Sequence, residues 1–240
     1  MRIVTLNTWK NEGHYATRLR LMAEGLAKLD PDVVCLQEAF SAKGFDTAAT
    51  LGMSLGLHVA AQPARAKPRR TPEGWIESAS GLAILSRTPV TDTFRITLSS
   101  DPRDGERIAQ LARLAPDILV LNLHLTHLSA ASPLRARQLA EALDGALSWD
   151  GQLIVAGDLN AAADAPELAL LDGHLDRNAP GTLQGPRADR ARTGPAVDHV
   201  ALLRPGRWRI ARRFNALDQP DTDGWFASDH AAVVADLVCD

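Results

Sequence analysis

Residues 153–160 read LIVAGDLN, four apolar residues that run directly into glycine, aspartate, leucine and asparagine. A short, continuous apolar run is typical of a strand that is covered on both faces. Its polar ending predicts a functional site at the carboxyl edge of a sheet, where loops converge without disturbing the core. In isolation the pattern is weak, because Gly-Asp-x-Asn is also a common strand-to-turn ending.

The arrangement recurs, and this recurrence predicts the fold. The segments 2–38 and 118–160 share one order: a strand, a helix, and a second strand with a polar ending. We therefore expect an α/β fold in which two sheets pack face to face with helices outside, a four-layer αββα sandwich, as a single domain over residues 1–240. Strands are expected at Arg2–Thr8, Val33–Gln37, Leu82–Ser86, Ile118–His124, Leu153–Ala156, Val197–Leu203 and Ala231–Val238.

Two segments carry apolar residues at helical spacing, Tyr15–Leu29 and Pro133–Leu147. The first is expected to end at Asp30, because the residue before a proline avoids the α region. The second is expected to begin with Ser132 as its N-cap and proline in its first turn. The Pro-, Gly- and Arg-rich segment Gln62–Ser80 is expected to be a loop.

Composition narrows the class of protein. A chain of 240 residues that is 45% hydrophobic can bury a full core. Its two cysteines, Cys35 and Cys239, fit neither a disulfide framework nor a zinc motif, so we expect reduced thiols and a cytoplasmic monomer. The sequence shows no signal peptide and no run of about 20 apolar residues, so no membrane span is expected. A net charge of −3 excludes a uniformly basic coat for nucleic acid, although it allows a local basic patch.

Polar residues at the strand ends are the candidates for catalysis. On an extended chain Asp158 and Asn160 are expected to point to the same side, the carboxylate to hold a water and the amide to donate to a developing oxyanion. His230 precedes the last strand, and Asp198, which lies within an apolar run, is the expected partner that fixes its tautomer. His124 is a second candidate, although a histidine flanked by leucines is more often a core residue.

A second group of polar residues predicts a metal site. Glu38 directly follows a buried strand, where a carboxylate needs a cation or hydrogen bonds to offset its desolvation. Together with Asn7 and Asp229 it would form a set of oxygen ligands, which suits Mg²⁺ or Mn²⁺. The alternative for Glu38 is a capping role at the start of a loop.

Several catalytic motifs are absent from the sequence. It has no P-loop, no Gly-x-Gly-x-x-Gly, no Gly-x-Ser-x-Gly elbow and no His-Glu-x-x-His. Ser228 lies near His230 in the sequence, but no elbow supports it as a nucleophile. Nucleotide-binding, serine-hydrolase and zinc-protease functions are therefore disfavoured.

Taken together, the motifs resemble the endonuclease/exonuclease/phosphatase superfamily, which contains pancreatic-type DNase, exonuclease III-type enzymes, inositol-polyphosphate 5-phosphatases and neutral sphingomyelinases. The resemblance implies a four-layered αββα fold and metal-dependent hydrolysis of a phosphate ester. The matching segments occur in family order: LNTW (6–9), DVVCLQE (32–38), GLAILSR (81–87), NLHLTH (122–127), RARQ (135–138), GDLN (157–160), VDHV (197–200) and SDH (228–230).

The resemblance also implies ligands for the metal. Asn7 and Glu38 would hold Mg²⁺, with Mn²⁺ as an alternative ion. Asp229 would contribute directly or through a water molecule.

The remaining matched residues would act on the phosphate ester. Asp158 would position the attacking water, and Asn160 would stabilise the pentacovalent phosphorane. His230, oriented by Asp198, and His124 would contact the non-bridging oxygens or assist proton transfer.

Departures from the family pattern bear on the substrate. In DNase-like members a glutamate partners the first histidine, but here the counterpart falls near Ser80, so the partner of His124 is open. The segment Gln37-Glu38-Ala39-Phe40 differs from the Gln-Glu-Thr-Lys of abasic-site repair enzymes, which disfavours that activity. Four lysines cannot supply the lysine-rich loops of the 5-phosphatases.

These observations predict a Mg²⁺-dependent phosphodiesterase. Its substrate would be a phosphate ester: a small molecule, a nucleic acid or a lipid head group. A nuclease would use basic residues, for which Arg65, Arg69, Arg70 and the arginines of 204–213 are candidates. A sphingomyelinase-like hydrolase would need contact with lipid, for which Trp225-Phe226 is a candidate. A non-catalytic binding protein is the least favoured alternative, because no motif residue is missing.

Overall fold

The structure is a computed structural model that describes residues 1–71, 74–115, 117–190, 192–204 and 206–239. Its helices are α1 (Tyr15–Leu29), α2 (Thr47–Leu55) and α3 (Ser132–Ala146), with short 3-10 helices η1 (Pro166–Leu171) and η2 (Ala188–Arg190). Its strands are β1 (Arg2–Asn7), β2 (Val33–Ala42), β3 (Phe45–Asp46), β4 (His58–Gln62), β5 (Lys67–Thr71), β6 (Gly74–Ser86), β7 (Asp92–Leu98), β8 (Arg107–Ala115), β9 (Ile118–His124), β10 (Gln152–Asp158), β11 (Asp198–Leu203), β12 (Trp208–Ala216) and β13 (Ala232–Cys239).

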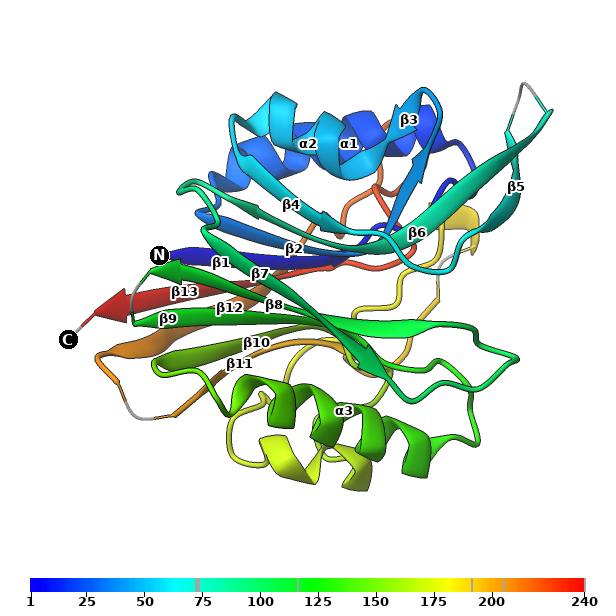
Figure 1. The fold of residues 1–240 in the computed structure, drawn as a ribbon. Helices are drawn as coiled ribbons and strands as arrows, with labels where there is room; N and C mark the ends of the chain where they lie inside the picture. Colours follow the sequence, from blue (N-terminus) through cyan, green and yellow to red (C-terminus); the bar gives the residue numbers. More distant parts are fainter. Residues whose placement is uncertain (72–73, 116, 191, 205, 240) are drawn as a thin grey trace.

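The described strands form two sheets that pack face to face (Figure 1). The eight-stranded sheet has the order β12-β13-β1-β2-β6-β4, with β3 paired to β2 and β5 paired to β6. The five-stranded sheet has the order β11-β10-β9-β8-β7. Helices α1 and α2 cover the outer face of the first sheet, and α3 covers that of the second. This arrangement confirms the predicted four-layer αββα sandwich.

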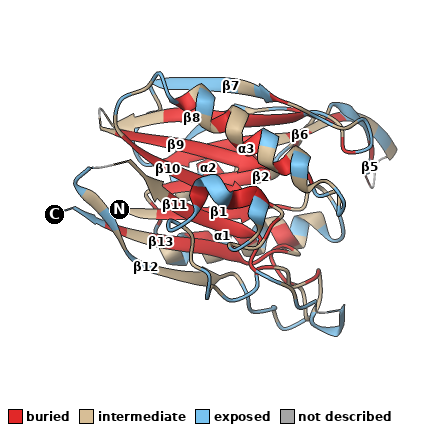
Figure 2. Cartoon of the chain, turned by 90° about the horizontal axis from the view of Figure 1, so that it is seen from below, coloured by how far each residue is buried: buried red, intermediate tan, exposed pale blue. Residues whose placement is uncertain are grey.

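Alternating side chains of the central strands fill separate apolar layers. Ile3 and Ile154 lie between the sheets, whereas Val4 packs outward with Met22 and Leu26 of α1. Because both faces of these strands are covered, their sequences are continuously apolar. Figure 2 shows the central strands buried along most of their length, while β7 and β12 at the edges carry more exposed residues.

The two similar halves of the sequence fold in the same way. The units β1-α1-β2 and β9-α3-β10 each bring two strands together in parallel. Asn7 pairs in register with Gln37, and Asp158 pairs in register with His124. The polar endings therefore meet at the end of the sandwich opposite the chain termini (Figure 1).

The segment Gln62–Ser80 is a loop only over residues 63–66, because β5 and β6 pair antiparallel over most of the rest; residues 72–73 lie outside the described part of the chain. Arg69 takes the buried position at which a strand normally carries an apolar residue. Its guanidinium donates hydrogen bonds to Ser78 Oγ at 2.8 Å and Ser80 Oγ at 2.7 Å. The hydropathy pattern does not predict β5, because these hydrogen bonds take the place of the apolar packing that usually marks a strand. Arg69 is thus unavailable to grip nucleic acid.

The start of α3 also differs from expectation. Ala131 occupies the N-cap position, and Ser132 is the first helical residue. Ser132 Oγ instead donates to Glu167 Oε2 at 2.6 Å, and Arg135 Nε donates to Glu167 Oε1 at 2.9 Å. The hydroxyl of Ser132 therefore binds Glu167 of η1 and does not cap the helix.

A buried polar network joins the two sheets directly beneath the polar strand ends. Gln37 Nε2 donates to Asn122 Oδ1 at 2.7 Å and to Thr5 Oγ1 at 3.0 Å. Asn122 Nδ2 donates in turn to the carbonyl oxygens of Leu36 and Ala83, at 3.0 and 3.1 Å. This network fixes how β9 lies against β2, and with it the position of the residues that follow each strand.

The substitution Asn122→Leu should lower the free energy of unfolding by about 2–4 kcal/mol, because it removes hydrogen-bond partners from buried groups on the facing sheet. Urea denaturation measures this loss. The control is Asn178→Leu at an exposed position, for which a change within about 0.5 kcal/mol is expected. Equal stability of the two variants would contradict a structural role for the network.

Candidate active site

A cleft of about 340 Å³ opens where the polar strand ends of the two sheets meet. It is lined by every predicted site residue except Asp198, and by several residues not assigned a role from the sequence. The lining residues are Asn7, Trp9, Lys10, Glu38, Arg65, Arg103, His124, His127, Asp158, Asn160, Asp229 and His230.

Strand register sets one row of these side chains. Asp158 on β10 pairs with His124 on β9 and with Asp198 on β11. Residues in register on adjacent strands project from the same face of a sheet, so all three point toward the other sheet. Gly157 permits this close pairing, because a Cβ there would lie 2.0 Å from the carbonyl oxygen of Leu123.

Asp158 stands at the centre of the cleft and is 1% exposed. Its Oδ2 accepts a hydrogen bond from Asn7 Nδ2 at 3.0 Å, across the gap between the sheets. The same oxygen lies 3.5 Å from His124 Nε2 and 4.0 Å from His230 Nε2. Burial and the nearby carboxylate of Asp198 raise the pKa of Asp158 to about 7.

His230 and Asp198 are hydrogen-bonded, with Nδ1 of the histidine 2.8 Å from Oδ2 of the aspartate. Burial by itself lowers the pKa of His230, but the carboxylates of Asp198, Asp158 and Asp229 outweigh it and raise the pKa to about 10. The hydrogen bond at Nδ1 leaves Nε2 directed toward Asp158. His230 is therefore a cationic donor in the cleft.

His124 has the opposite electrostatic setting. Burial lowers its pKa well below 6.5, and the neighbouring cations Arg107 and Lys10 lower it further. The family's glutamate partner is not found at the expected place, since Ser80 accepts a hydrogen bond from Arg69 and Glu77 is exposed. His124 is thus a neutral imidazole with arginines near it.

Asn160 reaches the cleft in a different way from the prediction. The chain is not extended after Asp158, because Asn160 adopts a left-handed conformation with φ of 50°. Its backbone N–H donates to Asp158 Oδ1 at 2.9 Å, which turns the chain. The side-chain Nδ2 donates to the carbonyl oxygen of Leu125 at 3.0 Å, and an amide has a second hydrogen to offer.

Asn7, Glu38 and Asp229 lie in the same cleft and offer only oxygen donors. Glu38 sits at a register shift in β2, where a φ of 55° turns its side chain out of the strand. Burial raises the pKa of Asp229, and the charge of Glu38 raises it further. Lys10 Nζ lies 2.9 Å from Glu38 Oε1, so a cation already accompanies this carboxylate. Two carboxylates and an amide oxygen fit a hard divalent cation.

A second group in the cleft also has the spacing of metal ligands. One ligand atom each from Asp158, Asp198 and His230 lies within 4.8 Å of the others. In this group, however, the Asp198–His230 hydrogen bond already engages Nδ1 of the histidine.

Backbone strain is concentrated around the cleft. Trp9, Lys10, Glu38, Arg65 and Asn160 all have φ between 46° and 55°. Left-handed conformations are costly for residues with a Cβ, and they persist where the surrounding structure enforces them. All five residues line the cleft.

The candidate arginines of residues 204–213 are not among the residues that line the cleft. Arg204 follows Leu203, which pairs with Leu153 at the opposite end of β10 from Asp158. Its guanidinium donates to the carbonyl oxygens of Trp149 and Ala146. Arg204 therefore contributes to structure at the far end of the sandwich.

The aromatic pair proposed to contact lipid is not available either. Phe226 is buried, and Trp225 stacks on His14 with ring centroids 4.3 Å apart. Arg187 packs over the Trp225 ring at 4.6 Å. None of the helices in the described part of the chain is long and apolar enough to cross a membrane.

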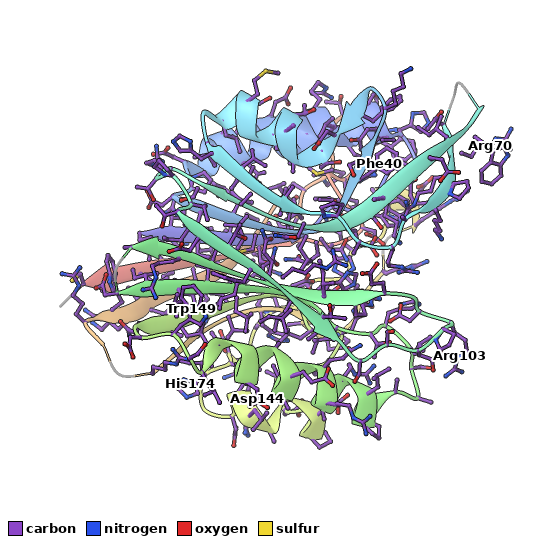
Figure 3. The ribbon with its side chains drawn as sticks, viewed as in Figure 1. Phe40, Arg70, Arg103, Asp144, Trp149 and His174 are labelled. Atoms are coloured by element: carbon purple, nitrogen blue, oxygen red, sulfur yellow. The ribbon has the colours of Figure 1, made fainter. Side chains whose placement is uncertain are left out.

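Sequence reasoning missed the cationic part of the cleft. Lys10, Arg103 and His127 line it, together with Arg65, the one residue of this group that the sequence had indicated as a candidate for binding nucleic acid. Figure 3 shows Arg103 at the same end of the molecule as Arg70 of the β5–β6 hairpin. The charge-rich run DPRDGER (101–107) was the available signal.

The model of the endonuclease/exonuclease/phosphatase family matches residues 4–238. The chain belongs to this family. Its members are typically metal-dependent hydrolases of phosphate esters, in agreement with the buried acidic and histidine residues of the cleft. No curated protein matches the chain in sequence.

Several solved structures share this fold, and their sequence identity to this chain is low. A functionally unknown conserved protein from Enterococcus faecalis is 19% identical with a TM-score of 0.73, covering 100% of both chains. An endonuclease/exonuclease/phosphatase from Beutenbergia cavernae is 21% identical with a TM-score of 0.73, over 100% of this chain and 71% of that one. TDP2 from Caenorhabditis elegans is 17% identical with a TM-score of 0.68, over 98% and 73%.

The two histidines should titrate very differently in metal-free protein. NMR titration of the ring protons should give a pKa of about 10 for His230, with His124 neutral throughout the physiological range. Asp198→Asn removes a negative neighbour that stabilises the imidazolium, so it should lower the pKa of His230 by about one unit or more. The control is His58→Gln on β4, which should leave both titrations unchanged. A His230 that titrates near 6.5 in both proteins would contradict the charge arrangement.

Proposed function

We propose that this chain is a Mg²⁺-dependent phosphodiesterase that activates a water molecule with Asp158. One observation carries the proposal: a buried carboxylate, held by Asn7 and flanked by two histidines, shares a cleft with the carboxylates of Glu38 and Asp229. In-line attack on a phosphodiester requires an aligned water, neutralised charge and donors for the phosphoryl oxygens. The cleft offers residues for each requirement.

Asp158 is the proposed base. Asn7 Nδ2 donates to one carboxylate oxygen and the Asn160 N–H donates to the other, so the group is fixed in orientation. A pKa of about 7 is close to the value at which a general base works best near neutral pH. The remaining lone pairs can accept a hydrogen bond from water and then its proton.

His230, His124 and Asn160 are the proposed donors to the phosphoryl oxygens. Asp198 keeps His230 protonated and fixes the orientation of its ring. The Nε2–H group can therefore donate a hydrogen bond to an anionic phosphoryl oxygen and then transfer its proton to the leaving group. His124 stays neutral and can donate one hydrogen bond. The second amide hydrogen of Asn160 can stabilise the charge of the pentacovalent phosphorane.

Asn7, Glu38 and Asp229 are the proposed ligands of Mg²⁺, or of Mn²⁺ in its place. Bound there, the ion would supply positive charge that offsets the charge of the phosphate. The ammonium group of Lys10, which pairs with Glu38, lies in the same part of the cleft.

The alternatives differ in substrate. A nuclease retains support, because Arg65 and other cations line the cleft. A hydrolase of lipid head groups is less well supported, because Phe226, a candidate for contact with lipid, is buried. A non-catalytic function is the least favoured alternative, because every candidate catalytic residue is present in the chain.

The variant Asp158→Ala should lower kcat by about 10²-fold or more, because it removes the group that aligns and deprotonates water. Release of product is measured with Mg²⁺ or Mn²⁺ from bis-p-nitrophenyl phosphate, p-nitrophenyl phosphate, plasmid DNA and a choline phospholipid. The control is Asp144→Ala on the outer face of α3, which should retain full activity (Figure 3).

We expect turnover of the diesters, no turnover in EDTA and loss in Asp158→Ala alone. Activity of Asp158→Ala equal to that of the wild type would overturn the proposed mechanism. A folded wild-type protein that is inactive on all four substrates with metal present would argue against the proposed activity.

A further inference from the structure

Arg65 places a guanidinium in the cleft without a hydrogen-bond acceptor. Its side chain is 19% exposed, and it lines both the cleft and a small cavity shared with His124. Within the described part of the chain, none of its guanidinium N–H groups makes a hydrogen bond; the nearest carboxylate oxygen, Asp104 Oδ1, is 3.7 Å from Nη1. None of its guanidinium nitrogens is fully buried, so their N–H groups face the open cleft, where a ligand can accept from them.

The carboxylate near Arg65 is already committed elsewhere. Arg107 donates to both oxygens of Asp104, from Nη2 at 2.6 Å and from Nε at 2.9 Å. His127 Nδ1 lies 2.8 Å from Asp104 Oδ1 as well. The oxygens of this buried carboxylate are therefore taken up by Arg107 and His127 at hydrogen-bond distance, and not by the guanidinium of Arg65.

The position of Arg65 is fixed rather than loose. Its backbone has a φ of 47°, and its N–H donates to Glu106 Oε2 at 3.3 Å. Its Nε lies against Gly105, where an added Cβ would come within 3.2 Å. The side chain is therefore held in the cleft before any ligand binds, which lowers the entropic cost of binding.

Several arginines elsewhere on the molecule are paired with carboxylates at hydrogen-bond distance. The pairs include Arg2–Asp236, Arg87–Asp30, Arg177–Asp172 and Arg207–Asp117. Among the described residues, no carboxylate oxygen lies at hydrogen-bond distance from the guanidinium of Arg65, and this residue lines the cleft that an anionic substrate would enter.

We propose that Arg65, with His127 beside it, forms a second anion subsite that binds another phosphate of the same substrate. The subsite rests on the proposed phosphodiesterase function and defines its substrate class: an ester with at least two phosphates. The planar fork of a guanidinium matches phosphate oxygens in two hydrogen bonds. Such a phosphate is carried by the terminus of a small phosphorylated molecule and by the neighbouring linkage of a nucleic-acid strand.

Calorimetric binding in EDTA, where no turnover is expected, tests the subsite by itself. The probes are the thymidine dinucleotide TpT, the same compound with a 5′ or a 3′ terminal phosphate (pTpT, TpTp), and the trinucleotide TpTpT. At least one probe with a second phosphate should bind about 10- to 100-fold more tightly than TpT. A gain with pTpT or TpTp alone indicates a terminal phosphate, and an equal gain with TpTpT indicates a strand.

Variants link the gain to Arg65. In Arg65→Ala the ratio of the affinity for the tighter probe to that for TpT should fall to about one. Arg65→Lys should retain only part of the ratio, because an ammonium group cannot form the bidentate pair of hydrogen bonds that a guanidinium forms with phosphate. The control is Arg137→Ala at an exposed position of α3, which should keep the wild-type ratio. A thermal melt of each variant checks that it is folded.

Equal affinity of the wild type for all four probes would overturn the proposal, as would a gain that persists in Arg65→Ala. The outcome is separable from the proposed function. A gain that depends on Arg65, in a protein that hydrolyses no phosphodiester with Mg²⁺, would support the subsite and reject the activity. Hydrolysis of bis-p-nitrophenyl phosphate, with no tighter binding of the probes that carry a second phosphate, would support the activity and reject the subsite.

Discussion

The buried carboxylate of Asp158 is the constraint on which the site depends. A carboxylate that is removed from water requires partners, and those of Asp158 come from both sheets: Asn7 from one and His124 from the other. The two sheets must therefore close on each other in one register for this group to be satisfied. The Gln37–Asn122 hydrogen bond beneath it enforces the same register, so packing of the fold and geometry of the site are parts of one arrangement.

Charge in the cleft is divided between two sides. The carboxylates of Asp198, Asp158 and Asp229 lie near His230, whereas the cations Arg107, Lys10 and Arg65 lie near His124. This division gives the two histidines different states: carboxylates keep His230 protonated, and burial with nearby cations keeps His124 neutral. Two residues of one type can therefore serve as a proton donor and a neutral hydrogen-bond donor.

The central fold was predictable because its strands are buried on both faces. Continuous apolar runs marked β1, β9 and β10, and the first helix has the predicted bounds Tyr15–Leu29. Edge elements were not predictable from hydropathy. β7 and β12 consist mainly of exposed and partly buried residues, and β5 uses Arg69 as a buried residue.

Candidate site residues could be found where they directly follow an apolar strand, as Asp158 and Glu38 do. Other features depend on contacts between distant segments. Arg65 becomes a cleft residue only through Asp104 and Gly105, some forty positions later in the chain, and no local pattern encodes that contact. The left-handed turn at Asn160 likewise arises from a hydrogen bond to Asp158, so the extended geometry expected from spacing was wrong.

The separation of metal ligands from catalytic groups is the central claim, and the position of a bound ion tests it most directly. Crystals grown with Mn²⁺ would locate the ion by its anomalous scattering. We expect one peak coordinated by Glu38 and Asp229, directly or through water, with the Asp198–His230 hydrogen bond intact. A peak coordinated by Asp158, Asp198 and His230 would contradict the claim, because the proposed base and proton donor would then be metal ligands.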